Sequence, residues 1–293
     1  MAAAAAAAPA APPAATPGST KLEIISVMSF NLLARCWVKP EWFPGVDVKT
    51  LVWEARVALN LKTITDAAPD VVCMQEVDEH SYPILKEKLA KAGYHLTDLA
   101  ANHPSSAAVK NGTATAYSAK RWSQQPDTSM LIGGMGTSIL NLPGFPLIVN
   151  IHLDRLNDGG AEQLEALWKV LGAHKRKECV VVGDTNVKQE DVVKLMPGKV
   201  IAPNGSMAIT PNGSMCFAAT QPAMVLDRLI AIGATVAPVP EGDQKWRDEQ
   251  WAASQIECPA PVEKHAFRAL ALSSVLARYG SDHMPIQFHV FSA

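Results

Sequence analysis

Several short motifs in this chain place polar side chains at the end of an apolar run, where a β-strand would emerge from a sheet. They supply carboxylates, amides and imidazoles, which together can hold a divalent cation and stabilise a phosphoryl group under attack. Each motif alone is a weak signal, but the set in this order predicts metal-assisted cleavage of a phosphoester. In chain order the motifs are Ser29-Phe30-Asn31, Met74-Gln75-Glu76-Val77, Asn150-Ile151-His152-Leu153, Gly183-Asp184-Thr185-Asn186, Leu226-Asp227-Arg228 and Gly280-Ser281-Asp282-His283.

Three positions offer oxygen ligands for a hard cation. Mg²⁺ prefers carboxylate and carbonyl oxygens at about 2.1 Å and keeps some of its waters. Glu76, the Asn31 amide oxygen and Asp282 could supply such a partial shell. The alternative for Glu76, taken alone, is an acid at a helix N-terminus that complements the helix dipole.

Asp184 and Asn186 form a second candidate group, directly after the apolar run Val180-Val181-Val182-Gly183. In an extended segment, residues two positions apart point to the same face. The carboxylate could then orient a nucleophilic water beside an amide that donates to a phosphoryl oxygen. Gly183 permits close backbone approach or an unusual turn. The alternative is a turn in which the Asp-x-Asn side chains satisfy their own backbone.

Two histidines complete the candidate catalytic set. His152 ends an apolar strand, where it could donate to a charged phosphoryl oxygen, or simply be a satisfied histidine at a strand end. His283 could contact the scissile phosphate or, paired with Asp227, act as an oriented acid or base. Asp227 lies in an otherwise apolar run, so a buried carboxylate there needs a partner, and the alternative is a structural salt bridge.

Composition limits the classes of partner and compartment. The net charge of −2 lacks the strongly basic footprint of proteins that bind long nucleic acid, whereas a small substrate or a chain end needs only a local patch. Five widely spaced cysteines without zinc-ligand spacing favour a reducing intracellular compartment, the cytoplasm or nucleus. We expect no cleaved targeting signal, no membrane span and a monomeric protein.

The order of elements predicts the fold class. Residues 1–20 are nearly all Ala and Pro and should form a disordered tail, followed by one domain over residues 21–293. Apolar runs predict strands, including a single strand from Met130 to Leu140, and these alternate with helical patterns. Single helices between groups of strands indicate an α/β sandwich of packed sheets with helices outside.

In this order, the motifs resemble those of the endonuclease/exonuclease/phosphatase superfamily from about Glu23 to Phe291. The resemblance implies a four-layered α/β sandwich, with two packed mixed β-sheets flanked by helices, and Mg²⁺-dependent phosphoester cleavage, with Mn²⁺ as an alternative metal. It implies that Asn31, Glu76 and Asp282 bind the metal. It also implies that His152 and Asn186 contact the phosphate, Asp184 positions the attacking water and Asp227 pairs with His283.

The N-terminal half resembles the deadenylase branch (nocturnin/Angel-like), with Asn31-Leu32-Leu33-Ala34, then Trp53 and Arg56, then Val72-Cys73-Met74-Gln75-Glu76-Val77-Asp78. The second half departs from this branch, because Val187 and Arg228 stand where it usually has a serine and an aromatic residue or histidine. Gly-Asp-Thr-Asn and Asp-Arg are more similar to tyrosyl-DNA phosphodiesterases of this fold, and Ser-Asp-His-x-Pro-Ile is more similar to inositol-polyphosphate phosphatases.

The leading expectation is a 3′-5′ exoribonuclease, deadenylase-like, that releases 5′-monophosphates from RNA. One alternative is a phosphatase or phosphodiesterase that acts on a small or lipid headgroup, such as an inositol phosphate, or on a tyrosyl-DNA adduct. An alternative of another class is a catalytically inactive binding module with the same fold. Inactive relatives should lack part of the acid, amide and histidine set, and every required position is filled here.

Overall fold

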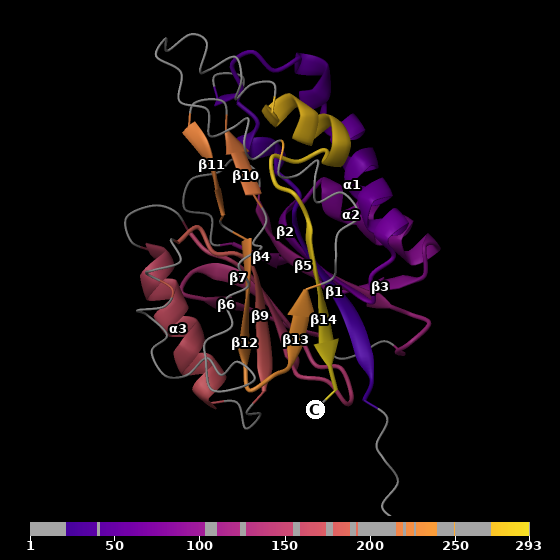
Figure 1. Cartoon of the computed structure of the whole chain (residues 1–293), viewed down its shortest axis with the longest axis vertical. Helices are drawn as coiled ribbons and strands as arrows, with labels where there is room; N and C mark the ends of the chain where they lie inside the picture. Colours follow the sequence, from indigo (N-terminus) through magenta and orange to yellow (C-terminus); the bar gives the residue numbers. More distant parts are fainter. Residues whose placement is uncertain are drawn as a thin grey trace, which may run out of the picture.

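Two β-sheets packed face to face form the centre of the molecule in the computed structural model (Figure 1). The structure describes residues 22–39, 42–102, 110–123, 127–154, 159–173, 178–187, 192, 215–218, 221–225, 227–238, 249 and 271–292. The expected tail over residues 1–20 lies outside these described residues.

The first sheet has seven strands in the order β13-β14-β1-β2-β5-β3, with β4 also paired to β5. Only β1 and β2 pair in parallel among the pairings described within this sheet, so it is mixed. Its strands are β1 (Ile24–Asn31), β2 (Val71–Asp78), β3 (Tyr94–Leu96), β4 (Ala100–Ala101), β5 (Asn111–Ser118), β13 (Val236–Pro238) and β14 (Ile286–Phe291).

The second sheet has five strands in the order β12-β9-β8-β7-β6 and is also mixed, because β8 and β9 pair in parallel. A separate antiparallel pair, β10 (Met215–Ala218) and β11 (Gln221–Val225), precedes β12. The five strands are β6 (Asp127–Ile132), β7 (Met135–Leu140), β8 (Leu147–His152), β9 (Cys179–Asp184) and β12 (Asp227–Ile232).

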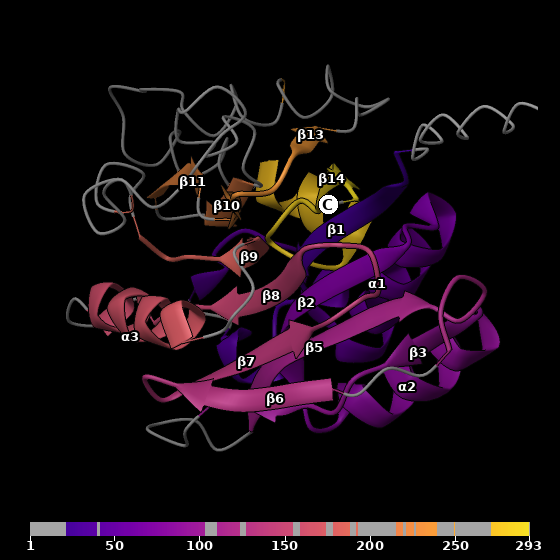
Figure 2. The ribbon, with the colours of Figure 1, turned by 90° about the horizontal axis from the view of Figure 1, so that it is seen from below.

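Helices cover the outer face of each sheet (Figure 2). α1 (Trp53–Ala67), α2 (Ser81–Lys91) and a helix over residues 271–279 pack on the first sheet, and α3 (Gly159–Ala173) packs on the second. Short 3-10 helices, η1 (Arg35–Trp37) and η3 (Val48–Leu51), lie between β1 and α1. The order helix, sheet, sheet, helix confirms the four-layered sandwich that the family resemblance implies.

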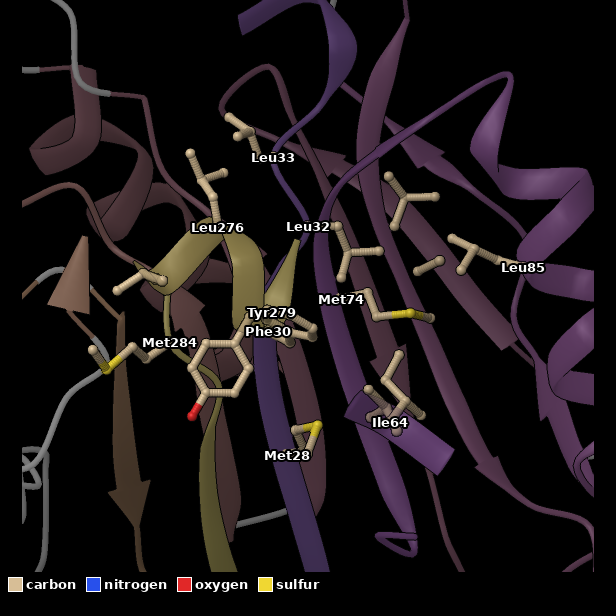
Figure 3. Packing of buried hydrophobic residues seen from close by; sticks show 14 of the residues in the cluster. Met28, Phe30, Leu32, Leu33, Ile64, Met74, Leu85, Leu276, Tyr279 and Met284 are labelled. Atoms are coloured by element: carbon tan, nitrogen blue, oxygen red, sulfur yellow. The ribbon is translucent and has the colours of Figure 1, made fainter. Parts of the chain in front are cut away.

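Three apolar clusters correspond to the three interfaces between these layers. Between the sheets lie mainly β-branched and aromatic side chains, including Val27, Val182 and Phe288. Beneath the helices of the first sheet, Phe30 and Tyr279 pack edge to face with ring centroids 6.5 Å apart. Figure 3 shows these two residues within the cluster. Burial of this apolar surface is the main favourable contribution to folding.

One predicted element is wrong. Residues 130–140 do not form one strand, because β6 and β7 pair as an antiparallel hairpin in which Ile132 faces Met135. Gly133 and Gly134 have φ of 58° and 84°, and two consecutive residues with positive φ make the tight turn that matches strand twist. The consecutive glycines Gly133 and Gly134 were the signal in the sequence that indicated this turn.

In the described part of the chain, no helix is long and apolar enough to cross a membrane. Cys36, Cys73 and Cys179 are free thiols, and the buried Cys73 and Cys179 lie in strands, where a thiol packs as a small apolar residue.

Candidate active site

Strand register aligns three of the predicted site residues across the second sheet. His152, the last residue of β8, lies opposite Asp184, the last residue of β9. Asp184 in turn lies opposite Asp227, the first residue of β12. In the first sheet Asn31 ends β1, and β9 packs against both β1 and β2. The carboxyl ends of the parallel strands therefore meet at one edge of the sandwich, where ligands bind in open α/β sheets.

Glu76 reaches this edge because the strand that carries it is irregular. The pairing of β2 with β5 shifts register between Met74 and Val77, and Glu76 has a φ of 54°. Such a bulge changes the direction of a side chain and is enriched beside active sites. Glu76 Oε1 accepts a hydrogen bond from Asn31 Nδ2 at 3.0 Å, and Oε2 accepts one from the Ala34 backbone N–H at 2.8 Å. The alternative of a helix N-terminal acid is wrong, since α2 begins only at Ser81.

The Asn31 amide joins the two sheets at the site. Its Nδ2 donates to Glu76 Oε1 and to Asp184 Oδ2, the latter at 3.1 Å, and lies 3.4 Å from His283 Nε2. Its Oδ1 accepts from the Leu33 backbone N–H at 3.0 Å. In this orientation the amide nitrogen faces the two carboxylates, and a ligand role for the amide oxygen would require the amide to turn over.

Asn186 is held in a turn and does not continue the extended strand. Its φ is 48°, its backbone N–H donates to Asp184 Oδ1 at 3.0 Å, and its Nδ2 donates to the Leu153 carbonyl at 2.8 Å. The expectation that Asp184 and Asn186 leave one face of an extended segment is therefore wrong. The Asx turn holds one Asp184 oxygen while Asn31 holds the other. The Asn186 amide has a second N–H that could donate to another acceptor.

The predicted pairing of Asp227 with His283 is present. Asp227 Oδ2 lies 2.6 Å from His283 Nδ1, and both side chains are almost fully buried. His283 Nε2 lies 3.8 Å from Asp184 Oδ2, so the imidazole joins the two carboxylates. The Ser281 hydroxyl donates to the Asn31 carbonyl at 2.7 Å and accepts from the His283 backbone N–H at 3.2 Å. Ser281 thus fixes the segment that carries Asp282 and His283 against the end of β1.

A buried polar network beneath the site was missed by sequence reasoning. Gln75 Nε2 donates to Asn150 Oδ1 at 2.8 Å, and Asn150 Nδ2 donates to the Met74 carbonyl at 3.0 Å. Both side chains bridge the two sheets. The predicted close backbone approach at Gly183 is confirmed, because a Cβ there would lie 1.9 Å from the Ile151 carbonyl oxygen and 3.2 Å from Gln75 Nε2. Polar residues at the inward positions of β2 and β8 were the available signal.

The electrostatics of the site fit a divalent cation. One ligand atom each from Glu76, His152 and Asp184 lies within 4.8 Å of the others. Burial raises the pKa of the Asp184 carboxyl, and the carboxylate of Asp227 raises it further. Burial also raises the pKa of Asp282 to about 6. Carboxylates crowded together away from water disfavour each other's ionisation, and a bound cation would relieve this repulsion.

The fold and this site define a phosphoester hydrolase. Residues 28–283 match the sequence profile of the Endonuclease/Exonuclease/phosphatase family, and the chain belongs to this family. Enzymes of the family generally depend on a divalent metal, and the acid-rich cluster is suited to hold one.

Two curated relatives match a short part of the chain. Nocturnin of Homo sapiens is 36% identical over 74 residues, which are 25% of this chain and 17% of that protein. The CCR4-Not complex 3′-5′-exoribonuclease subunit Ccr4 of Aspergillus oryzae is 36% identical over 76 residues, which are 26% of this chain and 10% of that protein. The matched segments thus span less than a fifth of these relatives.

Solved structures match nearly the whole chain. The structure of ANGEL2, described as a 2′,3′-cyclic phosphatase, has a TM-score of 0.66 at 16% identity and covers 93% of this chain and 96% of its own. The human Nocturnin catalytic domain with a bound sulfate anion has a TM-score of 0.54 at 19% identity and covers 92% and 95%. At these identities the likeness shows the shared fold.

Proposed function

We propose that this protein is a Mg²⁺-dependent 3′-5′ exoribonuclease that shortens RNA ends, including poly(A), and releases nucleoside 5′-monophosphates. The observation that carries the proposal is the convergence of Glu76, His152 and Asp184 within 4.8 Å at the strand ends. The substrate class is supported by the 36% identity of a segment to Nocturnin and to an exoribonuclease subunit.

Glu76 and Asp282 would hold Mg²⁺ with the help of Asn31, and Mn²⁺ would be accepted by the same oxygen ligands. When bound, the cation supplies Lewis-acid polarisation of a phosphoryl oxygen. Asn31 would help through its amide nitrogen, which donates to Glu76 and Asp184 and fixes the separation of these carboxylates, while its amide oxygen accepts from the Leu33 N–H.

Asp184 is proposed to orient the attacking water and accept its proton. Its two carboxylate oxygens are held by Asn31 Nδ2 and the Asn186 backbone N–H, so its orientation is fixed before a substrate arrives. His152 Nε2 lies 3.7 Å from Glu76 and 3.7 Å from Asp184, at the position where it can donate to a phosphoryl oxygen. The second N–H of Asn186 would contact the same phosphate.

The His283–Asp227 pair is proposed to act on the phosphate from the other side of Asp184. Because Asp227 accepts from Nδ1, the imidazole keeps Nε2 directed toward Asp184 and Asn31. A buried carboxylate beside the ring stabilises a protonated imidazole, which can donate to a phosphoryl oxygen as charge develops.

Further proposals concern the whole chain. The two packed sheets support one catalytic domain over residues 21–293, and the free thiols of the described residues support action inside the cell. We further propose that the protein acts as a monomer. ANGEL2, the solved structure with the TM-score of 0.66, is described as a 2′,3′-cyclic phosphatase, so cyclic-phosphate RNA ends are a second candidate substrate.

The test uses a 5′-labelled single-stranded RNA with a 3′ poly(A) tract, incubated with Mg²⁺ or with EDTA. Wild type is compared with Glu76→Ala and with Glu79→Ala, because Glu79 is a nearby exposed acid that contacts only His80 among the described ion pairs. Stepwise shortening that requires Mg²⁺ and Glu76 but not Glu79 is expected. Intact RNA would refute the exonuclease proposal, and RNA ending in a 2′,3′-cyclic phosphate, inositol phosphates and tyrosyl-DNA would then be assayed.

A further inference from the structure

Arg56 on α1 is the largest fully buried side chain in the described part of the chain, and it lies behind the candidate site. Its guanidinium donates only to backbone carbonyls. Nη1 lies 2.6 Å from the Leu33 oxygen, 3.4 Å from the Leu32 oxygen and 3.4 Å from the Gly280 oxygen, and Nε lies 3.4 Å from the Leu51 oxygen. One buried cation thus joins the segments that follow β1 and precede Asp282.

The bond to Leu33 has a specific consequence. Leu33 has a φ of 58°, a left-handed conformation that costs a leucine energy and must be held by its surroundings. Its carbonyl accepts from Arg56, while its backbone N–H donates to Asn31 Oδ1 at 3.0 Å. That second bond fixes which end of the Asn31 amide faces the carboxylates.

The other side of the contact is equally tight. Gly280 has a φ of 73°, and a Cβ there would lie 2.4 Å from the Arg56 carbonyl oxygen. One turn along α1, Asn60 Nδ2 donates to the Tyr279 carbonyl at 2.8 Å. Arg56 also lines a small cavity together with Glu76, Asn60 and Trp53, so it lies close to a carboxylate of the site.

We propose that Arg56 is a positioning residue for the metal site, which it controls through a relay of hydrogen bonds rather than by contact with substrate. The relay runs from the Arg56 guanidinium to the Leu33 backbone, then to the Asn31 amide, then to Glu76 and Asp184. Without it, the Asn31 amide can turn over, and the two carboxylates lose the donor that holds them together. The inference rests on the proposed function in one respect: it assumes that Glu76 and Asp184 lie next to the bound cation.

The test measures Mn²⁺ binding by the full-length protein without any substrate, from the electron paramagnetic resonance signal of the free ion. Arg56→Lys keeps the positive charge but loses the planar arrangement of donors. We expect roughly a 10- to 100-fold loss of Mn²⁺ affinity, as is typical when a residue that orients a metal ligand is replaced.

The control is Arg121→Lys, an exposed arginine at the opposite end of β1. Arg121 also donates to a carbonyl, that of Ile24 at 2.9 Å, and its guanidinium lies 5.1 Å from the Trp122 ring centroid. Because Arg121 is exposed, this control should change the melting temperature little, and it should leave Mn²⁺ affinity unchanged. Equal Mn²⁺ affinity in Arg56→Lys and wild type would overturn the proposal.

A double-mutant cycle separates the relay from a general structural role. If Arg56 acts through Asn31, Arg56→Lys should cause no further loss of Mn²⁺ affinity in an Asn31→Ala protein. Independent, additive losses would refute the relay. Should Arg56→Lys not fold, the same measurements are made on Arg56→Gln, which keeps an amide donor, and failure of both to fold would make Arg56 a folding residue and end the proposal. Because no RNA is present, failure of the exonuclease assay leaves this result intact.

Discussion

Replacing Asp282 with asparagine should stabilise the metal-free protein at neutral pH, although it removes a proposed metal ligand. Burial raises the pKa of Asp282 from its ordinary 3.8 to about 6, so ionisation of this carboxyl opposes folding once the pH exceeds these values. At about 1.4 kcal/mol per pKa unit, the cost at pH 7 is about 3 kcal/mol. Asparagine has nearly the same shape and no charge, so Asp282→Asn should recover up to this amount.

The pH dependence gives the sign of the effect. Because the folded protein holds the Asp282 proton more tightly than the unfolded chain, stability from this group is fully present below about pH 4 and is lost as the pH rises through about 6. Urea unfolding in EDTA should therefore show Asp282→Asn more stable than wild type at pH 7 and equal to it near pH 4. A gain of the same size at both pH values, or no gain at pH 7, would refute the reasoning.

Three further predictions concern the same site. Gly183→Ala should lower the free energy of unfolding by about 2–4 kcal/mol, measured by urea unfolding, because the new Cβ would overlap the Ile151 carbonyl; wild-type stability would contradict the close approach. Asp227→Asn should reduce kcat by about a hundredfold or more with little change in KM, since His283 loses its charged partner. Steady-state kinetics on RNA measures both, and an unchanged kcat would show that the pair is only structural. Mg²⁺ at a hundred times its Kd should raise the free energy of unfolding by about 2.7 kcal/mol in wild type and much less in Glu76→Ala, as a thermal melt with and without EDTA would reveal.

Elements with strong local signals could be predicted from the sequence. The strands that carry Asn31, Glu76, His152 and Asp184 are apolar runs that end in a polar residue, and the structure ends β1, β8 and β9 at or next to those residues. The layered architecture also follows from the alternation of strands and helices. These signals are local, since each depends on a few neighbouring residues.

Features that depend on contacts between distant segments could not be predicted. Gln75 and Asn150 are recognisable as polar residues in apolar strands, but nothing local shows that they bond to each other and join the two sheets. The orientation of the Asn31 amide depends on Leu33, whose conformation depends in turn on Arg56 in another element. Motif spacing therefore identifies which residues gather, while the direction of each polar group is set by the assembled fold.

Backbone conformation shows where the fold departs from what the sequence prefers. Among the described non-glycine residues, positive φ occurs at Leu33, Ala68, Glu76 and Asn186. Ala68 is the left-handed cap that ends α1, a common way to end a helix. The other three lie at or beside the site, although such conformations cost about 1–3 kcal/mol each and are sparse elsewhere.

The hydrogen bonds of the site itself hold these three residues. Glu76 is held by Asn31 and Ala34, Asn186 by Asp184 and the Leu153 carbonyl, and Leu33 by Arg56 and Asn31. Each strained residue therefore stays in place only while its polar partners do, because no regular strand or helix would impose that conformation. A single lost hydrogen bond can then release a strained backbone as well as a side chain. It follows that replacing a hydrogen-bond partner of these residues, even one that never touches substrate, should weaken metal binding by more than the loss of that one hydrogen bond.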